Sequence, residues 1–295
     1  AQVFASNLGG TATLIGDPPN ILIGSAANLT FNDFVVNLLP AIAVAVAATG
    51  LIGHLVWGRR LRAEPERRAA VLARHAHEVI TDRVTMWKSL AVLAVVVATF
   101  VFARPLGLEA GTIAMSGAAL LVGLTSLGRT AEAQTKHLHE NLADVEWITL
   151  FFFIGLFIMV GGVQKAGLLD RAAHALVSAT HGDRHELMLA ILWGSALLSA
   201  VLDNIPFVAT MIPVIQALTP TLGGHEAVRP LWWALALGAC LGGNGTLVGA
   251  SANLTVSGIA ERAGTPFGFR RFTLPAFPLM LLTIAIAHLY LVWRY

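Results

Sequence analysis

The sequence predicts an all-α integral membrane fold with discontinuous helices and an internal repeat. Of its 295 residues, 56% are hydrophobic and only 12% are charged, whereas soluble domains carry about 25% charged residues. Several apolar stretches approach the length of about 20 residues that a helix needs to cross a bilayer. A glycine-rich motif also occurs twice. The chain is therefore expected to fold in lipid and not around a soluble core.

Five apolar stretches qualify as membrane-spanning helices, because each has the required length and almost no charge. They are residues 40–57, 87–102, 111–127, 147–163 and 272–293. Two shorter apolar stretches, 187–201 and 205–218, are joined by a polar tip at 202–206. Their shortness and their close connection predict one re-entrant hairpin instead of two spans.

The internal repeat joins the two ends of the chain. Residues 8–20 align without gaps on residues 241–253, 233 positions later, and seven of the thirteen positions are identical. The match extends to residues 34–40 and 269–275 once two inserted residues are allowed. The second repeat begins near residue 86, so the same spacing places the start of the first about 148 residues before Ala1. We therefore expect this chain to be part of a longer protein.

The repeat divides the chain into three parts. Residues 1–57 form the C-terminal part of the first repeat, 58–85 a basic linker, and 86–295 the second repeat. Residues 58–88 carry eight Lys and Arg against four acids, and such an excess in a short loop marks the cytoplasmic side. Counted from there, span 40–57 runs inward and its counterpart 272–293 runs outward. The two repeats are therefore predicted to be inverted.

Segments 9–20 and 242–253 are predicted to be broken helices. Proline removes a helical hydrogen bond, and glycine tolerates backbone conformations that end a helix. Non-helical backbone within a membrane must be buried in protein or line a cavity. Inverted repeats with discontinuous helices are the usual construction of secondary transporters, with the site between the repeats. We therefore expect a transport site at these two segments.

The glycines allow two other interpretations. A nucleotide-binding loop is disfavoured because neither copy has a following Lys-Ser/Thr pair or a preceding soluble strand. Close helix packing through small residues remains an alternative, although it does not explain the Asp, the prolines and the Asn beside the glycines of the first copy.

Polar residues in or near these segments and at the hairpin tip are the predicted substrate- and ion-binding residues. They are Asn7, Thr11, Thr13, Asp17, Asn20, Asp203, Asn204, Asn244, Thr246, Ser251 and Asn253. Ionised acids are costly at membrane depth, so such residues are functional candidates by default. The structural alternatives are that Asp17 caps the following half-helix and that Asp203 forms an Asx turn.

Metal and enzymatic chemistry have no support in the sequence. Cys240 is the only cysteine, which excludes a thiolate cluster, and the ten histidines follow no metal-binding or catalytic pattern. The bases lie beside apolar spans, which argues against a nucleic-acid partner. We expect no enzyme activity and no resident cofactor, with Na⁺ or H⁺ as the possible coupling ion.

Three long motifs carry a family resemblance. Residues 6–20, 202–210 and 238–253 resemble the ion transporter superfamily, nearest to the branch of ArsB/NhaD-type arsenite permeases and the P protein. The layout is also similar to that of sodium-coupled citrate and dicarboxylate carriers. The resemblance implies a homodimeric, elevator-type transporter with scaffold helices in 86–165, a transport hairpin and broken helix in 187–263, and a last span at 272–293.

One departure from that pattern bears on the substrate. The sequence has Asp203-Asn204-Ile205 where dicarboxylate carriers have Ser-Asn-Thr, and a carboxylate there repels a dianion. The first candidate is therefore ion-coupled efflux of arsenite or antimonite. Sodium/proton antiport and organic anion transport (citrate or a dicarboxylate) are the alternatives, and a passive channel subunit or membrane-embedded enzyme is the alternative from another class.

The expected partners follow from this reading. They are a small inorganic or organic ion as substrate, membrane lipid, a second copy of the chain and, for an arsenite pump, a soluble ATPase. The expected location is the cell membrane, with multiple spans.

Overall fold

A computed structural model describes residues 2–58, 65, 66, 69, 73, 80, 82–128 and 130–295. These residues form helices and turns, with no strand in the described part of the chain. Most of the predicted linker 58–85 lies outside the described residues, including Arg59, Arg60, Arg62, Arg67, Arg68 and Arg74. Its cytoplasmic location stays a prediction. The chain divides into unit 1 (Ala1–Ile52 with Phe152–Tyr295) and unit 2 (Gly53–Phe151).

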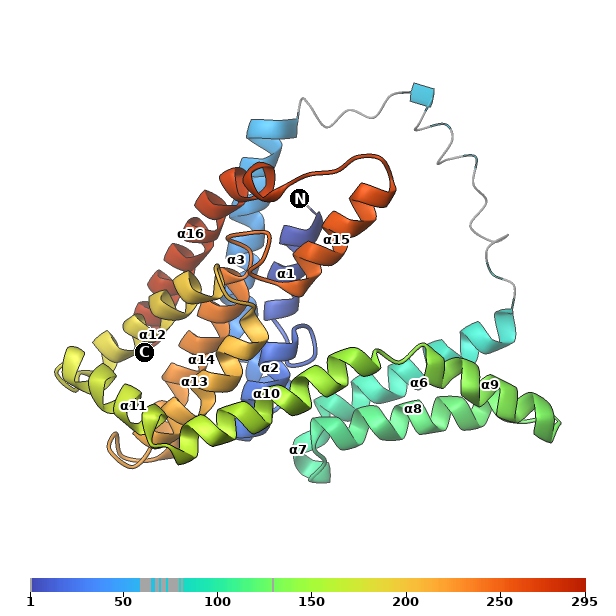
Figure 1. Ribbon diagram of the computed structural model, residues 1–295, viewed down its shortest axis with the longest axis horizontal. Coiled ribbons are helices and arrows are strands. Elements are labelled where there is room, and N and C mark those ends of the chain that lie inside the picture. Colours follow the sequence, from blue (N-terminus) through green and yellow to red (C-terminus); the bar gives the residue numbers. More distant parts are fainter. Residues whose placement is uncertain are drawn as a thin grey trace. The chain divides into compact units, whose positions relative to one another are not determined.

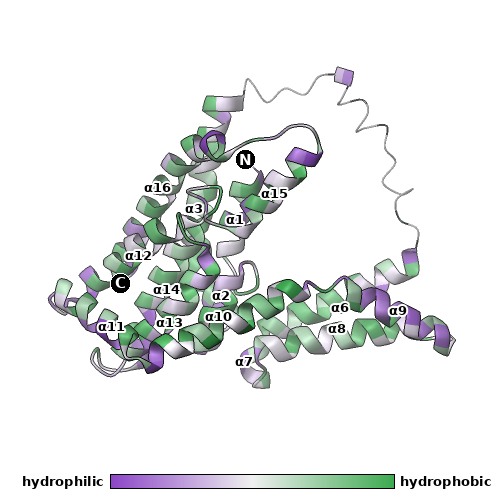
Figure 2. Ribbon diagram, in the orientation of Figure 1, coloured by the Kyte–Doolittle hydropathy of each residue, from purple (hydrophilic) through white to green (hydrophobic). Residues whose placement is uncertain are grey.

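Four helices in the described ranges are long and apolar enough to cross a membrane: α3 (Phe31–Trp57), α6 (Arg83–Val101), α10 (Trp147–Lys165) and α16 (Phe269–Arg294). The fifth predicted span corresponds to α8 (Ala110–Ser126), an apolar but shorter helix. Apolar residues predominate along these helices (Figure 2), and Ile148 and Ile158 of α10 are 87% and 70% exposed. Such surfaces suit lipid.

The predicted starts of two spans were too late. Helix α3 begins at Phe31, with Pro40 in its interior, and α16 begins at Phe269, with Pro275 and Pro278 in its interior. Membrane helices tolerate proline in their interior, so Pro40 does not mark the start of α3. Pro275 and Pro278 already lay inside the predicted span 272–293, so they do not account for the earlier start of α16.

Unit 2 contains α6, the single-turn α7 (Ala103–Leu106), α8 and the polar helix α9 (Ala131–Ala143). Helices α6 and α8 pack along each other. The Lys88 Nζ of α6 donates to the Leu124 carbonyl at the end of α8, at 2.7 Å. A cation at that end also suits the negative pole of the α8 dipole.

Unit 1 is assembled around α14 (His225–Gly242), whose residues are all buried from Leu231 onward. The other elements are α1 (Gln2–Thr11), α2 (Pro18–Ala27), α11 (Leu168–Ala179), α12 (Arg184–Ser199), α13 (Asn204–Leu218) and α15 (Ser251–Arg262), along with most of α3, most of α10 and the whole of α16 (Figure 1).

Helices α12 and α14 pack at very short range. A Cβ added to Gly238 would lie 2.5 Å from the Leu192 carbonyl oxygen, and one added to Gly242 would lie 2.5 Å from that of Ala196. Small residues four positions apart allow membrane helices this approach. The packing interpretation of the glycines therefore holds at Gly242.

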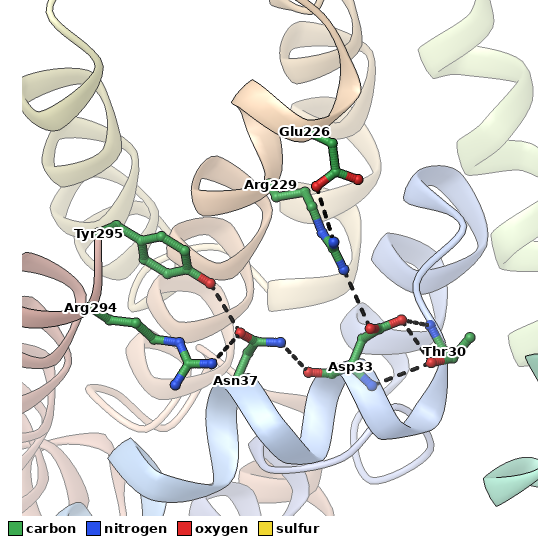
Figure 3. Close-up of polar contacts among 7 residues, drawn as sticks. All are labelled: Thr30, Asp33, Asn37, Glu226, Arg229, Arg294 and Tyr295. Carbon is green, nitrogen blue, oxygen red and sulfur yellow. Dashed lines mark hydrogen bonds and ion pairs between the residues drawn. The ribbon is translucent and has the colours of Figure 1, made fainter.

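A polar cluster ties the start of α3 to the start of α14 and the end of α16 (Figure 3). The Asp33 carboxylate accepts from the Thr30 amide and hydroxyl and pairs with Arg229 at 3.3 Å. The Asn37 amide oxygen accepts from Arg294 at 2.9 Å and from Tyr295 at 3.0 Å. These contacts join residues assigned to different repeats into one body.

Candidate transport site

The first broken helix is interrupted at residues 12–17, which we call the first crossover. Helix α1 ends at Thr11 and α2 begins with Pro18 and Pro19 in its first turn, where proline needs no hydrogen-bond partner. Gly9 and Gly10 are still helical, so the predicted break began too early. The buried Asn20 amide donates to the carbonyls of Thr11 and Thr13, at 3.1 and 2.9 Å.

The second broken helix is interrupted at residues 243–250, the second crossover. Helix α14 continues through Gly242, and α15 begins at Ser251. The Asn253 amide, also fully buried, donates to the carbonyls of Gly243 and Thr246, both at 2.9 Å. Asn20 and Asn253 occupy the same repeat position, so in each copy one amide satisfies two carbonyls that the break removed from the helical ladder.

A pair of glycines closes each crossover. A Cβ on Gly10 would lie 2.5 Å from the Gly16 carbonyl oxygen, and one on Gly243 would lie 2.8 Å from that of Gly249. The two pairs are again equivalent in the repeat. Only glycine permits the backbone to return so close to itself.

The two copies also exchange hydrogen bonds. Asn7 donates to the Asn253 oxygen at 3.1 Å, and the Cys240 thiol donates to the Asn20 oxygen at 3.5 Å. Cys240 is the repeat counterpart of Asn7, so the two bonds correspond under exchange of the copies. The broken helices run through unit 1 in opposite directions (Figure 1). The inverted relation of the complete repeats stays a prediction.

A further exchange involves the next turn. Asn7 also donates to the Asn244 oxygen at 3.0 Å, and the Cys240 thiol interacts with Thr11, the repeat counterpart of Asn244. In both exchanges the paired residues occupy equivalent positions of the sequence repeat.

The tip between α12 and α13 lies against both crossovers. Asp203 is the N-cap of α13 and accepts from the Ile205 amide at 3.1 Å, and the Ser251 backbone also donates to it. The Asn204 amide lies 3.5 Å from the Asp17 carboxylate, and Asp203 acts electrostatically on Asp17. The tip therefore brings the start of α13 to the starts of α2 and α15.

Asp17 is at the N-cap position of α2 but makes no capping bond with its side chain. Pro18 and Pro19 have no amide hydrogen to donate, and the backbone N–H of Asn20 donates to the backbone carbonyl of Asp17 and not to its side chain. The capping interpretation of Asp17 is therefore wrong. The Asx-type interpretation of Asp203 is correct, and it is compatible with a place in the site.

Two contacts hold the hairpin to the second broken helix. The Thr246 hydroxyl donates to the Ala200 carbonyl, and the Ser199 hydroxyl donates to the Ala239 carbonyl at 2.7 Å. Thr246 thus has a structural contact, as does Thr11, whose hydroxyl donates to the Asn7 carbonyl.

All the predicted site residues lie in unit 1, in the crossovers, in the helices that flank them or at the tip. Among them, the Thr13 carbonyl accepts from Asn20, and the Ser251 backbone donates to Asp203. Sequence reasoning missed Cys240 because a lone cysteine was considered only as a metal ligand. The repeat alignment carried the signal, since it places Cys240 opposite Asn7.

The charge of the site is acidic. Segments 2–20, 199–218 and 238–256 contain Asp17 and Asp203 but no Lys or Arg. Positive potential in these segments can therefore come only from helix N-termini and bound cations. In the described part of the chain, no three His, Cys, Asp or Glu residues are grouped in a way that could hold a metal.

Comparison with known proteins agrees with this architecture. Residues 1–238 match the family model described as "Citrate transporter". The chain is 43% identical over its whole length to an uncharacterized transporter of Mycobacterium tuberculosis and 41% identical to a 46 kDa membrane protein of Mycobacterium leprae, covering 67% of each. It is 31% identical to the P protein of Sus scrofa, over 99% of this chain and 42% of that protein.

The chain thus spans about two thirds of the length of its mycobacterial relatives. The relatives are named transporters or membrane proteins, and the helices have the length and composition to cross a bilayer. A transporter assignment also agrees with the expectation that the chain is not an enzyme. The P protein relation fits the resemblance of the motifs, whereas nothing in the comparisons singles out the arsenite permeases. The protein is a multi-pass membrane transporter that belongs to the citrate transporter family.

Proposed function

We propose that the protein is an ion-coupled secondary transporter whose cargo binds between the two crossovers and the Asp203–Asn204 tip. The observation that carries the proposal is the convergence of two broken helices and a hairpin tip on buried amides and two acids. Broken helices at a repeat interface supply the helix termini and free backbone groups from which transporters build their sites.

The cargo favoured by the family is an organic anion of the citrate or dicarboxylate class. Since the three segments hold two acids and no basic residue, such an anion would be repelled unless positive charge accompanied it. A bound cation or a proton on an acid supplies that charge. Coupling to Na⁺ or H⁺ therefore fits the electrostatics of the site.

Arsenite or antimonite efflux is the second candidate. These solutes are uncharged and carry hydroxyl groups at neutral pH, so they suit a site of amides and hydroxyls without bases. In that case the acids would serve proton or cation exchange. Sodium/proton antiport would use the same acids without a cargo anion. The elevator movement and the homodimer implied by the resemblance belong to this proposal as well.

The test is solute flux in proteoliposomes that contain the purified full-length protein. Citrate, succinate, arsenite and Na⁺ are supplied separately, with and without imposed Na⁺ and pH gradients. We expect one solute to move faster when a gradient is imposed. Movement insensitive to both gradients would contradict coupled transport and indicate a passive pathway.

Asp203→Asn and Asp183→Asn make a matched pair. Both aspartates are N-caps of hairpin helices, and asparagine caps as well as aspartate does. Asp183 is exposed, and hydrogen bonds from the backbone amides of Glu186 and His185 lower its pKa. We expect Asp203→Asn to reduce coupled flux by at least about tenfold and Asp183→Asn to leave it unchanged. Equal flux in the two variants would remove Asp203 from the site.

A further inference from the structure

The amide nitrogen of Asn244 is a buried hydrogen-bond donor without a partner. Asn244 is 0% exposed, and its Nδ2 makes no hydrogen bond to any described residue. Nearly all buried donors in proteins are paired, and one left unpaired opposes folding. An unpaired donor at the centre of a binding site therefore indicates a ligand atom that completes it.

The hydrogen-bond network fixes which atom of Asn244 is unpaired. The Asn253 nitrogen donates to two carbonyls, so its oxygen must be the atom that faces Asn7. Asn7 therefore donates through its side-chain nitrogen, and Asn244 must accept through its side-chain oxygen. Rotating the Asn244 amide would place two donors against each other. The unpaired atom is consequently the nitrogen, and its missing partner is an acceptor.

The repeat shows that the crossover does not need this donor. The counterpart of Asn244 is Thr11, whose hydroxyl donates to the Asn7 carbonyl at 2.8 Å within its own helix. The same position in the first copy is therefore fully satisfied by a local bond. The two crossovers share their glycine pairs and asparagine bonds, and among the described residues only the second has an unpaired amide, so the donor of Asn244 is not explained by the shared architecture.

We propose that Asn244 Nδ2 donates to an oxygen atom of the cargo and makes this position a determinant of cargo specificity. The inference rests on the proposed transport function and deepens it. It assigns the cargo's oxygen acceptor to the second crossover, whose segment lacks acids, and it assigns the coupling ion to Asp17 on the first. A bare cation cannot be the partner of Asn244, because an amide N–H repels it.

The proposal predicts a specific pattern for Asn244→Ala. Asn7 retains the Asn253 oxygen as its acceptor, so the substitution removes the unpaired donor without creating another. We expect the cargo-free protein to unfold at an unchanged or higher temperature. The cargo concentration for half-maximal flux should rise at least about tenfold, with the maximal rate and the dependence on the ion gradient retained.

Citrate, succinate and arsenite are the probes, and the purified full-length protein is measured by flux and by the rise in unfolding temperature that each probe causes. Asn141→Ala is the control, since Asn141 is a part-buried amide on α9 that contacts His137. If Asn244→Ala does not fold, Asn244→Thr replaces it, because threonine occupies the equivalent position of the first copy, where its hydroxyl is satisfied by a carbonyl of its own helix.

The outcomes separate this inference from the proposed function. Unchanged half-maximal concentration and unchanged probe-induced stabilisation in the Asn244 variants, with coupled flux intact in the wild type, would overturn the role of Asn244 alone. Absence of flux and of stabilisation in the wild type with every probe would overturn the proposed function and this inference together. Loss of cargo affinity with coupling retained would support both.

Discussion

The first and second crossovers are held by the same devices but carry different chemistry. Each is closed by a glycine pair and by an asparagine that donates to two carbonyls, and each receives a hydrogen bond from the other copy. The first continues as Asp17-Pro18-Pro19, whereas the second continues as Ala250-Ser251-Ala252.

The consequence of this difference is electrostatic. The two prolines remove the amides that would pair with Asp17, and its carboxylate faces the Cys240 thiol, Asn204 and Asp203. At the second crossover the backbone amide of Ser251 donates to Asp203 instead. The first crossover thus offers an acid to a cation or proton, and the second offers N–H groups to an acceptor. Symmetric architecture with asymmetric charge suits a cargo that moves together with an ion.

The largest predicted effects belong to the two paired asparagines. Asn20→Ala and Asn253→Ala each leave two carbonyls without their donor, which should cost about 2 to 5 kcal/mol of unfolding free energy. We expect Asn253→Ala to be the more harmful, because both of its bonds are buried whereas one bond of Asn20 is partly exposed. Thermal unfolding of the purified protein measures this, and a smaller loss in Asn253→Ala would contradict the account.

The glycine pairs provide the next test. Gly10→Ala brings a methyl group against the Gly16 carbonyl and should cost about 1 to 3 kcal/mol. Gly9→Ala is the adjacent control, since nothing lies within 4 Å of its Cβ and alanine is the better helix former. Lower stability and flux in Gly10→Ala, with neither reduced in Gly9→Ala, is the expected result. Equal behaviour of the two variants would mean that the first crossover is more open than described.

The bonds exchanged between the copies should give the smallest effect. Cys240→Ala removes a weak thiol donor that lies 3.5 Å from the Asn20 oxygen and also faces Asp17, and it should cost about 1 kcal/mol beyond the small loss of volume. Asn7→Ala removes two amide bonds at once and should cost more. A double-mutant comparison of Cys240→Ala with Asn20→Ala should show coupling. Additive losses would indicate that the thiol and the amide do not interact.

The sequence alone was sufficient for the membrane class and for the two helix interruptions, because both depend on local patterns. Span length and low charge located α3, α6, α10 and α16, and the repeat located both crossovers. It was less informative on the exact breaks: Gly9 and Gly10 continue α1, and Gly242 continues α14. Glycine permits a break, but close packing against a neighbouring backbone uses the same residue, and only the fold distinguishes the two.

The pairing of side chains was also beyond sequence reasoning. The sequence position of Asp17 suggested a helix cap. The prolines that follow it have no amide hydrogens to donate to its carboxylate, and the Asn204 side chain at the hairpin tip donates to it instead. The roles of Cys240 and Asn244 depend on hydrogen bonds to partners more than 200 residues away in the sequence. Such contacts depend on the packing of the two copies, which no local pattern contains.

The most direct test of the central claim is the dependence of cargo flux on the Na⁺ and pH gradients in Asp17→Asn, beside the wild type and Asp170→Asn. Asp170 is an exposed acid of α11 at a distance in sequence from both crossovers. If the first crossover holds the coupling ion, Asp17→Asn loses flux or loses its gradient dependence, and Asp170→Asn behaves as the wild type. Gradient dependence in Asp17→Asn equal to that of the wild type would contradict the account.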